Sequence, residues 1–208
     1  MKNALERLKE NETFFIENPT QYRGNWSTLF GNNHPIHIEI GCGKGQFIKE
    51  LASLNPNINY IAIEKYDSVL LRASEKFLDS SIKNLKLILL DATQIEEVFK
   101  EEEISLIYIN FSDPWPKSAH KKRRLTYKTF LESYKKILTA DGAIYQKTDN
   151  RHLFEFSLES FCENGWLISN ISLDLHQDLN IFNIETEFEE KWSKLGPIYR
   201  LEARKRSV

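Results

Sequence analysis

The sequence predicts an α/β fold with a doubly wound, mostly parallel sheet that carries helices on both faces. Two observations support this prediction. Between residues 36 and 172, short apolar runs of strand length alternate with longer runs that have the period of an amphipathic helix. The short runs are apolar along almost their whole length, as in parallel strands that helices cover on both sides. This alternation is typical of an α/β sheet and not of separate helical and β layers.

Five runs rich in Ile, Leu and Tyr are expected to form strands. They are IHIEI at 36–40, YIAIE at 60–64, LKLILLD at 85–91, ISLIYINF at 104–111 and AIYQKT at 143–148. The segment GPIYRLEARK at 196–205 is expected to add one late strand at an edge of the sheet.

Four runs between the strands are expected to form helices, because their apolar residues recur on one face. They span 45–55, 66–81, 126–142 and 150–165. The last two close on Gly142 and Gly165, and a glycine after the last turn is a common helix end. A length of 208 residues suits one core. We therefore expect a single domain over 34–208, preceded by a polar, partly helical extension over 1–33.

The composition excludes several classes of protein. With 41% hydrophobic and 28% charged residues, the chain is neither collagen-like nor wholly disordered. No apolar run approaches the ~20 residues of a membrane span, and the amino terminus has no signal-peptide core. Cys42, Cys162 and the five histidines show no metal-ligand or redox spacing. These features favour a cytoplasmic protein without a metal or a membrane partner, and they leave a monomer and a homodimer open.

The charge is distributed unevenly along the chain. The formal net charge is −2, which by itself does not indicate a nucleic-acid partner. Residues 113–128, however, contain six Lys or Arg residues against the single acid Asp113. A local patch of this kind attracts phosphate groups even when the whole protein is acidic.

Acidic residues follow three successive strands near a glycine turn. Gly41 and Gly43 allow a tight turn, but their GxGxG spacing differs from the dinucleotide fingerprint GxGxxG. A carboxylate at Glu39 would repel a pyrophosphate but suits the ammonium and sulfonium of S-adenosylmethionine. Glu64 is placed to accept from ribose hydroxyls, and Asp91 from an adenine amino group. The pattern favours S-adenosylmethionine, with a nicotinamide or another nucleotide as the alternative.

The loop after the fourth strand combines a carboxylate, an aromatic ring and cations. Asp113 ends the strand, and Pro114 and Pro116 fix their own φ angles and bias Trp115 toward extended backbone. Such a stiff loop can hold a ring and a carboxylate against a planar base at low entropic cost. The alternative is that Trp115 only covers the core. The cations at 121–124 would bind the phosphates of a polyanion, unless they are simply solvated.

These segments together resemble a known enzyme family. EIGCGKGQF, AIEK, LDA, NFSDPWPKSAHKKRR, KTDN and TEFEEKW are similar to the corresponding segments of bacterial tRNA (guanine-N7)-methyltransferases. The resemblance spans residues 36 to about 200, and its most specific part is the SDPWPK run with the cations that follow it. It implies a seven-stranded, Rossmann-like class I methyltransferase fold. It also implies methyl transfer from S-adenosylmethionine to N7 of a guanosine in the tRNA variable loop.

The resemblance also implies roles for individual residues. At the cofactor it places Glu39, Glu64, Asp91 and Asp113, beside the glycine turn of Gly41 and Gly43. At the substrate it places Lys117, Asp149, Thr186, Glu187, Phe188 and Glu189. It places an RNA contact at Ala119, His120, Lys121, Lys122, Arg123 and Arg124.

Two of these assignments compete with roles in helix capping. Asp149 is also a candidate N-cap for the helix that begins near Arg151, a role for which Asn150 competes. Thr186 and Glu189 have the spacing of a capping box, which is the reading that spacing alone favours.

The chemistry of the implied reaction limits what the protein must supply. Guanine N7 has a free lone pair and no proton, so no general base is needed to create the nucleophile. A carboxylate near the base, either Asp113 or Asp149, would select guanine and stabilise the positive charge that develops on the ring. We take Asp113 as the candidate catalytic residue. The alternatives are a methyltransferase for another RNA or DNA base and a non-catalytic RNA-binding module.

Overall fold

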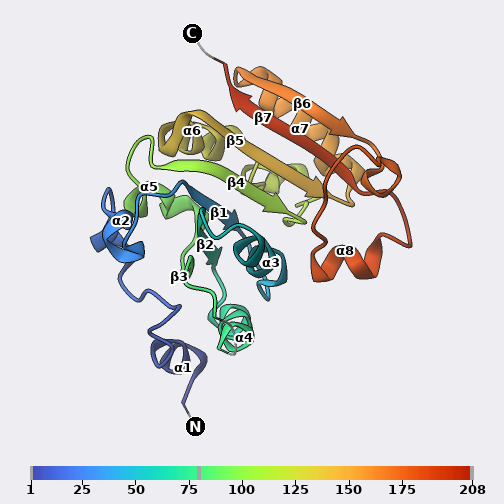
Figure 1. Cartoon of the computed structure of the whole chain (residues 1–208). Helices are drawn as coiled ribbons and strands as arrows, with labels where there is room; N and C mark the ends of the chain where they lie inside the picture. Colours follow the sequence, from blue (N-terminus) through green and yellow to red (C-terminus); the bar gives the residue numbers. More distant parts are fainter. Residues whose placement is uncertain (1, 79–80, 207–208) are drawn as a thin grey trace.

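The computed structural model describes residues 2–78 and 81–206. Its centre is a seven-stranded sheet of order β3-β2-β1-β4-β5-β7-β6 (Figure 1). The strands from β3 to β5 pair in parallel, whereas β7 runs antiparallel to β5 and β6. The strands are β1 (Ile36–Ile40), β2 (Asn59–Glu64), β3 (Leu85–Leu89), β4 (Ile104–Asn110), β5 (Leu138–Thr148), β6 (Trp166–Ser172) and β7 (Tyr199–Lys205). The predicted doubly wound, mostly parallel α/β sheet is confirmed.

Helices cover both faces of the sheet and enclose two apolar cores. One face carries α1 (Ala4–Lys9), α3 (Gln46–Leu54) and α4 (Asp67–Phe77). The other carries α2 (Trp26–Phe30), α5 (Ile95–Val98), α6 (Lys128–Ile137) and α7 (Arg151–Glu163). The short α8 (Glu187–Trp192) lies beside α3 (Figure 1). The 3-10 turns are η1 (Pro19–Tyr22), η2 (Ala92–Gln94), η3 (Ser118–Arg123) and η4 (Leu175–Gln177).

The alternation of side chains along β1 places one acid inside the molecule. Ile36, Ile38 and Ile40 point into the core beneath α5 and α6. Because neighbouring side chains in a strand point to opposite faces, Glu39 lies on the face that α3 covers. The parallel arrangement brings the carboxyl ends of β1, β2 and β4 to one edge, where ligands bind in doubly wound sheets.

Residues within the range 2–33 pack closely against the rest of the chain. Trp26 is fully buried, and its ring lies 5.5 Å from that of Phe99. Phe15 forms a parallel bridge with Leu87, in which the Ile16 amide donates to the Leu87 carbonyl at 2.9 Å. This segment therefore adds backbone pairing to the outer side of β3. No helix within the described ranges is both long and apolar enough to cross a bilayer.

Two predicted helix ends differ from the structure. The helix expected over 126–142 begins at Lys128 and ends at Ile137, and β5 follows at once. Leu138 is fully buried and pairs with Ile104 of β4, so tertiary pairing overrides the stop expected at Gly142. The helix expected over 66–81 is α4, which ends at Phe77; residues 79–80 of that prediction lie outside the described residues. At Gly165 the backbone is left-handed just after α7, as predicted.

The last strand does not lie at an edge, so that prediction is wrong. β7 pairs with β5 from Ala143 to Thr148 on one side and with β6 on the other. The edge strand is β6. The last segment of the chain inserts between β5 and β6, which both precede it in sequence. Local sequence does not specify this insertion.

Candidate active site

The loop between β1 and α3 is shaped by its glycines. Gly41, Gly43 and Gly45 all have left-handed backbone, with φ of 78°, 56° and 75°. A Cβ atom on Gly45 would lie 2.6 Å from Cζ of Phe77, so α4 packs directly against the loop. A side chain at these positions would be strained or would clash, and the loop therefore presents bare backbone to the strand edge.

Glu39 is buried beneath this loop with one oxygen left unpartnered. Its Oε1 accepts a hydrogen bond from Nδ2 of Asn110 at 2.9 Å. Its Oε2 is buried and has no hydrogen-bond partner among the described residues. Burial raises the pKa of Glu39 to about 7, although the Asn110 hydrogen bond and the Lys147 charge act in the opposite direction. Because an orphaned buried carboxylate oxygen is costly, this atom is suited to a cationic donor from a ligand.

Glu64 and Asp91 are held at the same edge by backbone groups. Glu64 Oε2 accepts from the Gly43 amide at 3.2 Å, and its Oε1 accepts from the Lys65 amide at 2.9 Å. Asp91 Oδ1 accepts from the hydroxyl and amide of Thr93 at 2.6 and 2.9 Å. These bonds lower the pKa of Asp91 and keep its carboxylate charged. The structure thus brings three of the four predicted cofactor acids, Glu39, Glu64 and Asp91, to the carboxyl ends of β1, β2 and β3.

Two adjoining cavities follow this edge. The first, of about 450 Å³, includes Glu39, the glycine loop, Phe188 and Trp192 in its lining. The second, of about 580 Å³, has a lining that includes Glu64, Asp91, Asp113, Trp115, Lys122 and Arg123. Both are lined by Gly41, Val69, Asn110 and Phe111, so the cavities meet at the ends of β1 and β4. Sequence reasoning did not identify Asn110 and Phe111 as site residues. Asn110 could have been identified, because a polar side chain that ends an apolar strand often lies at a ligand site.

The loop after β4 is strained at two residues. Phe111 and Trp115 have φ of 50° and 43°, so the extended backbone predicted for Trp115 is wrong. Such conformations cost about 1–3 kcal/mol each and persist only where the surroundings enforce them. Here Arg124 donates to the carbonyls of Pro114 and Trp115 at 2.9 and 3.1 Å. Trp115 is half-buried, and Asp113 is exposed toward the second cavity.

The basic run forms η3, and Lys122 and Arg123 of this turn line the second cavity. Lys117 is exposed, and its carbonyl accepts from the His120 amide at 2.8 Å. The His120 ring lies 5.8 Å from that of Trp115, and the Arg123 guanidinium lies 4.8 Å from the same ring. Exposed side chains in this run are those of Ala119, Lys121, Lys122 and Arg123. The structure therefore places exposed cations next to the Asp113 loop.

The α8 segment reaches the glycine loop from far along the chain. Thr186 Oγ1 accepts from the Glu189 amide at 2.9 Å, and the Glu189 carboxylate accepts from the Thr186 amide at 3.4 Å, which confirms the capping box. Gln46 of α3 donates to Glu190 at 2.6 Å. Phe188 lies 4.9 Å from Phe111, measured between ring centroids. The contacts position Thr186, Glu187 and Phe188 in the lining of the first cavity.

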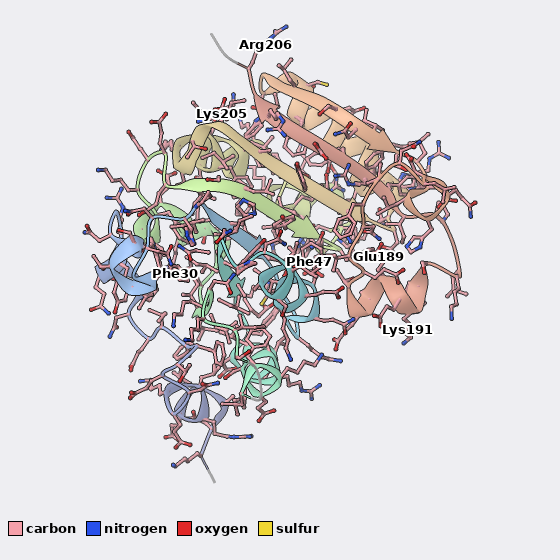
Figure 2. All side chains as sticks on the ribbon, in the orientation of Figure 1. Phe30, Phe47, Glu189, Lys191, Lys205 and Arg206 are labelled. Atoms are coloured by element: carbon pink, nitrogen blue, oxygen red, sulfur yellow. The ribbon has the colours of Figure 1, made fainter. Side chains whose placement is uncertain are left out.

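A buried ion pair anchors α8. Glu189 is fully buried, and its Oε2 lies 2.6 Å from Nζ of Lys147. Lys147 Nζ also donates to the Ile184 carbonyl at 2.8 Å and lies 4.9 Å from the centroid of the Phe47 ring. Figure 2 shows Glu189 of α8 beside Phe47 of α3. Burial lowers the pKa of Lys147, while the carboxylates of Glu189 and Glu39 oppose that shift.

Sequence reasoning missed Lys147. A signal was present, because in AIYQKT the alternation of strand side chains turns Lys147 to the same covered face as Ala143 and Tyr145.

Asp149 differs from the predicted cofactor acids because, in the part of the chain that the structure describes, it lines neither cavity. It is exposed directly after β5. The N-cap of α7 is Asn150, whose side chain accepts from the Leu153 amide at 2.9 Å. Of the two candidates for the cap, Asn150 therefore takes the role.

Comparison with known proteins gives this site its context. A family model described as "Putative methyltransferase" matches residues 33–201. The tRNA (guanine-N(7)-)-methyltransferase of Bacillus cytotoxicus is 53% identical over 205 residues, covering 98% of this chain and 94% of that protein. The Bacillus subtilis protein of the same name is 52% identical, covering 96% of this chain and 94% of that protein. The chain belongs to the tRNA (guanine-N7)-methyltransferase family.

The solved structures agree with a methyltransferase fold. The 16S rRNA methyltransferase KamB superposes with a TM-score of 0.67 at 11% identity, covering 88% of this chain and 94% of that one. The Rossmann-like class I methyltransferase fold is thus confirmed. The site also fits S-adenosylmethionine, the methyl donor. Its ammonium would satisfy the orphaned Oε2 of Glu39, and the bare backbone of the glycine loop leaves room for close approach.

Proposed function

We propose that the protein transfers a methyl group from S-adenosylmethionine to N7 of a guanosine in the variable loop of tRNA, in the cytoplasm. The observation that carries this proposal is the continuity of the site. The acids suited to the cofactor line two cavities that share Phe111 in their linings. The exposed cations Lys122 and Arg123 line the second of these cavities. The names of relatives more than 50% identical over nearly the whole chain support the same substrate.

Cofactor binding is assigned to the strand-edge acids and the glycine turn. S-adenosylmethionine supplies a methyl group activated by a sulfonium. Glu39 would hold its ammonium, Gly41 and Gly43 would contact the methionine portion, and Glu64 would accept from the ribose hydroxyls. Asp91 accepts from the adenine amino group, in a position that its bonds to Thr93 preorganise.

The catalytic task is alignment and charge stabilisation. Guanine N7 attacks with its own lone pair, so the protein need not remove a proton first. Holding two reactants in line contributes on the order of 7–11 kcal/mol relative to a bimolecular encounter. Asp113, which lines the second cavity, accepts from the guanine edge and stabilises the positive charge that develops on the ring.

Substrate RNA contacts are assigned to two surfaces. Thr186, Glu187 and Phe188 line the first cavity, and Phe188 offers a partly exposed ring on which a base can stack. The run from Ala119 to Arg123, together with Lys117, faces the phosphates. Glu189 does not lie on either surface; its buried bond to Lys147 holds α8, which carries Glu187 and Phe188, in place.

The direct test is to incubate the protein with isotope-labelled S-adenosylmethionine and unmodified tRNA, then to identify the nucleoside by mass spectrometry. Labelled 7-methylguanosine is the expected product. A label on another nucleoside would instead support a methyltransferase for a different base. Cofactor binding without any transfer would indicate a binding module.

The pH dependence of cofactor binding should reveal Glu39. Its pKa is raised to about 7, so the free protein is protonated at this carboxyl below that pH. An ammonium ligand binds the charged form, and affinity should therefore rise as pH increases through the range from about 6 to 8 and flatten above it. Isothermal titration with S-adenosylhomocysteine measures this. In Glu39→Gln the affinity should be lower and its pH dependence flatter; identical slopes in both proteins would refute the assignment.

Replacing Glu64 with Ala should weaken cofactor binding by about 10- to 100-fold, because the ribose loses a charged acceptor. tRNA affinity should change by less than about twofold. The matched control is Glu50→Ala, since Glu50 is exposed on α3 and away from both cavity linings of the described chain. Both affinities are measured by titration, and equal weakening of the two in Glu64→Ala would contradict a cofactor-specific role.

A further inference from the structure

Arg124 differs from the cations that precede it. Its guanidinium is half-buried, whereas the side chains of Lys121, Lys122 and Arg123 are exposed. Nε donates to the Pro114 carbonyl at 2.9 Å, and Nη2 donates to the Trp115 carbonyl at 3.1 Å. Two of its donors are therefore already used inside the protein.

A third contact fixes the plane of the guanidinium. Its central carbon lies 4.4 Å from the centroid of the Phe156 ring on α7. The contact with an aromatic face adds a favourable electrostatic term, and the planar fork suits the two successive carbonyls. Arg124 thus connects the loop after β4 to helix α7.

The two hydrogen bonds from Arg124 are made at the strained part of the loop. Trp115 has a φ of 43° and precedes Pro116, a combination that a free chain disfavours. The carbonyls that Arg124 binds belong to Trp115 and to Pro114, the residue directly after Asp113. If these bonds were lost, the backbone would relax, and the direction in which Asp113 points would change with it.

Lys121 and Lys122 offer a contrast on the same turn. Within residues 2–78 and 81–206 neither side chain forms a hydrogen bond or ion pair, and Lys122 lines the second cavity. Their charges are free to meet phosphates without first breaking internal bonds.

We propose that Arg124 is a positioning residue for methyl transfer, and that it acts by holding the 111–116 loop and not by contacting RNA phosphate. The inference rests on the proposed function, because its readout is the transfer of a methyl group to tRNA. It divides the basic run into two parts. Lys121 and Lys122 supply affinity for RNA, and Arg124 supplies the geometry of the loop that carries Asp113.

The test compares two variants that separate charge from geometry. Arg124→Lys keeps the positive charge but cannot donate a fork to two carbonyls. It should preserve the slope of log affinity for tRNA against log salt, and it should lower the single-turnover rate at saturating tRNA and cofactor by about 10- to 100-fold. The double variant Lys121→Ala/Lys122→Ala should lose about 0.7 to 0.9 of slope per contact, a loss that Arg124→Lys should not show.

Three controls keep the outcomes distinct. Thermal unfolding shows whether Arg124→Lys remains folded at the assay temperature. If it does not, Phe156→Leu removes only the aromatic face and should give a smaller loss of rate, again with the salt slope unchanged. A normal saturated rate in Arg124→Lys would overturn the inference, and a reduced salt slope with a normal saturated rate in Arg124→Ala would make Arg124 a phosphate contact. Absence of 7-methylguanosine with the unaltered protein would instead refute the proposed function.

Discussion

Replacing Asp113 with Asn should lower the single-turnover rate of methyl transfer by about 10²- to 10³-fold, while tRNA affinity and thermal stability stay close to those of the unaltered protein. The size of the loss is that expected when one preorganised electrostatic group is removed from a site where charge develops. Asn keeps the shape and one acceptor oxygen of the side chain but removes its charge. Asp113 is exposed toward the second cavity, so its removal leaves no buried partner unsatisfied.

Single-turnover rates at several cofactor concentrations separate the two ways in which Asp113 can act. If the carboxylate only positions the cofactor, the defect should fade at saturating S-adenosylmethionine. Asp149→Asn is the matched control, because Asp149 is also exposed but lies outside the cavity linings found in the described chain. A normal rate in Asp113→Asn would leave Asp113 as a loop-shaping residue, and a larger loss in Asp149→Asn would transfer the contact with guanine to Asp149.

Replacing Lys147 with Met should lower the free energy of unfolding by about 3–5 kcal/mol, because it leaves the carboxylate of Glu189 buried without its partner. The pair is almost completely buried, with side-chain exposures of 6% for Lys147 and 0% for Glu189. Adding Glu189→Leu should restore part of the lost stability, since it removes the uncompensated charge. The recovery should be incomplete, because the same change removes the capping-box bond to Thr186 and the contacts of Glu189 with His176 and Asn183.

Denaturant unfolding measures both effects. The control is Lys136→Met, which breaks the exposed ion pair of Lys136 with Glu96 at 2.8 Å. Exposed pairs contribute little to stability, so that variant should unfold nearly as the unaltered protein does. If Lys147→Met and Lys136→Met lowered the free energy of unfolding by similar amounts, the buried pair would contribute no more to stability than the exposed one.

The features that could be predicted from sequence are those set by local periodicity and by one topological rule. The first four strands, together with α3 and α4, follow from apolar spacing. Parallel strands then bring their carboxyl ends to one edge, and this places Glu39, Glu64 and Asp91 together without any knowledge of distances. The capping box at Thr186 was also readable, because it depends on residues only three apart.

The features that could not be predicted depend on contacts between distant segments. Trp115 is left-handed because Arg124 binds the carbonyls beside it, and local proline preferences indicate the opposite conformation. Strand alternation could have indicated that Lys147 is buried, but it could not identify the partner, because Glu189 lies on α8, 42 residues further along the chain. The place of β7 between β5 and β6 is likewise a matter of pairing over distance, which no local pattern specifies.

The two outer strands of the sheet are each made unsuitable for pairing with a further strand. On β3, the amide and carbonyl of Leu87 are already occupied by Phe14 and Ile16. On β6, the register shifts between Ser169 and Ser172, and Asn170 between them has a φ of 48°, which bends the free edge. An open, flat edge is a template on which unfolded or partly folded chains can add strands and aggregate. Residues 14–16 therefore occupy part of the β3 edge on which a further strand would otherwise pair, a contact separate from the chemistry at the carboxyl ends of the strands.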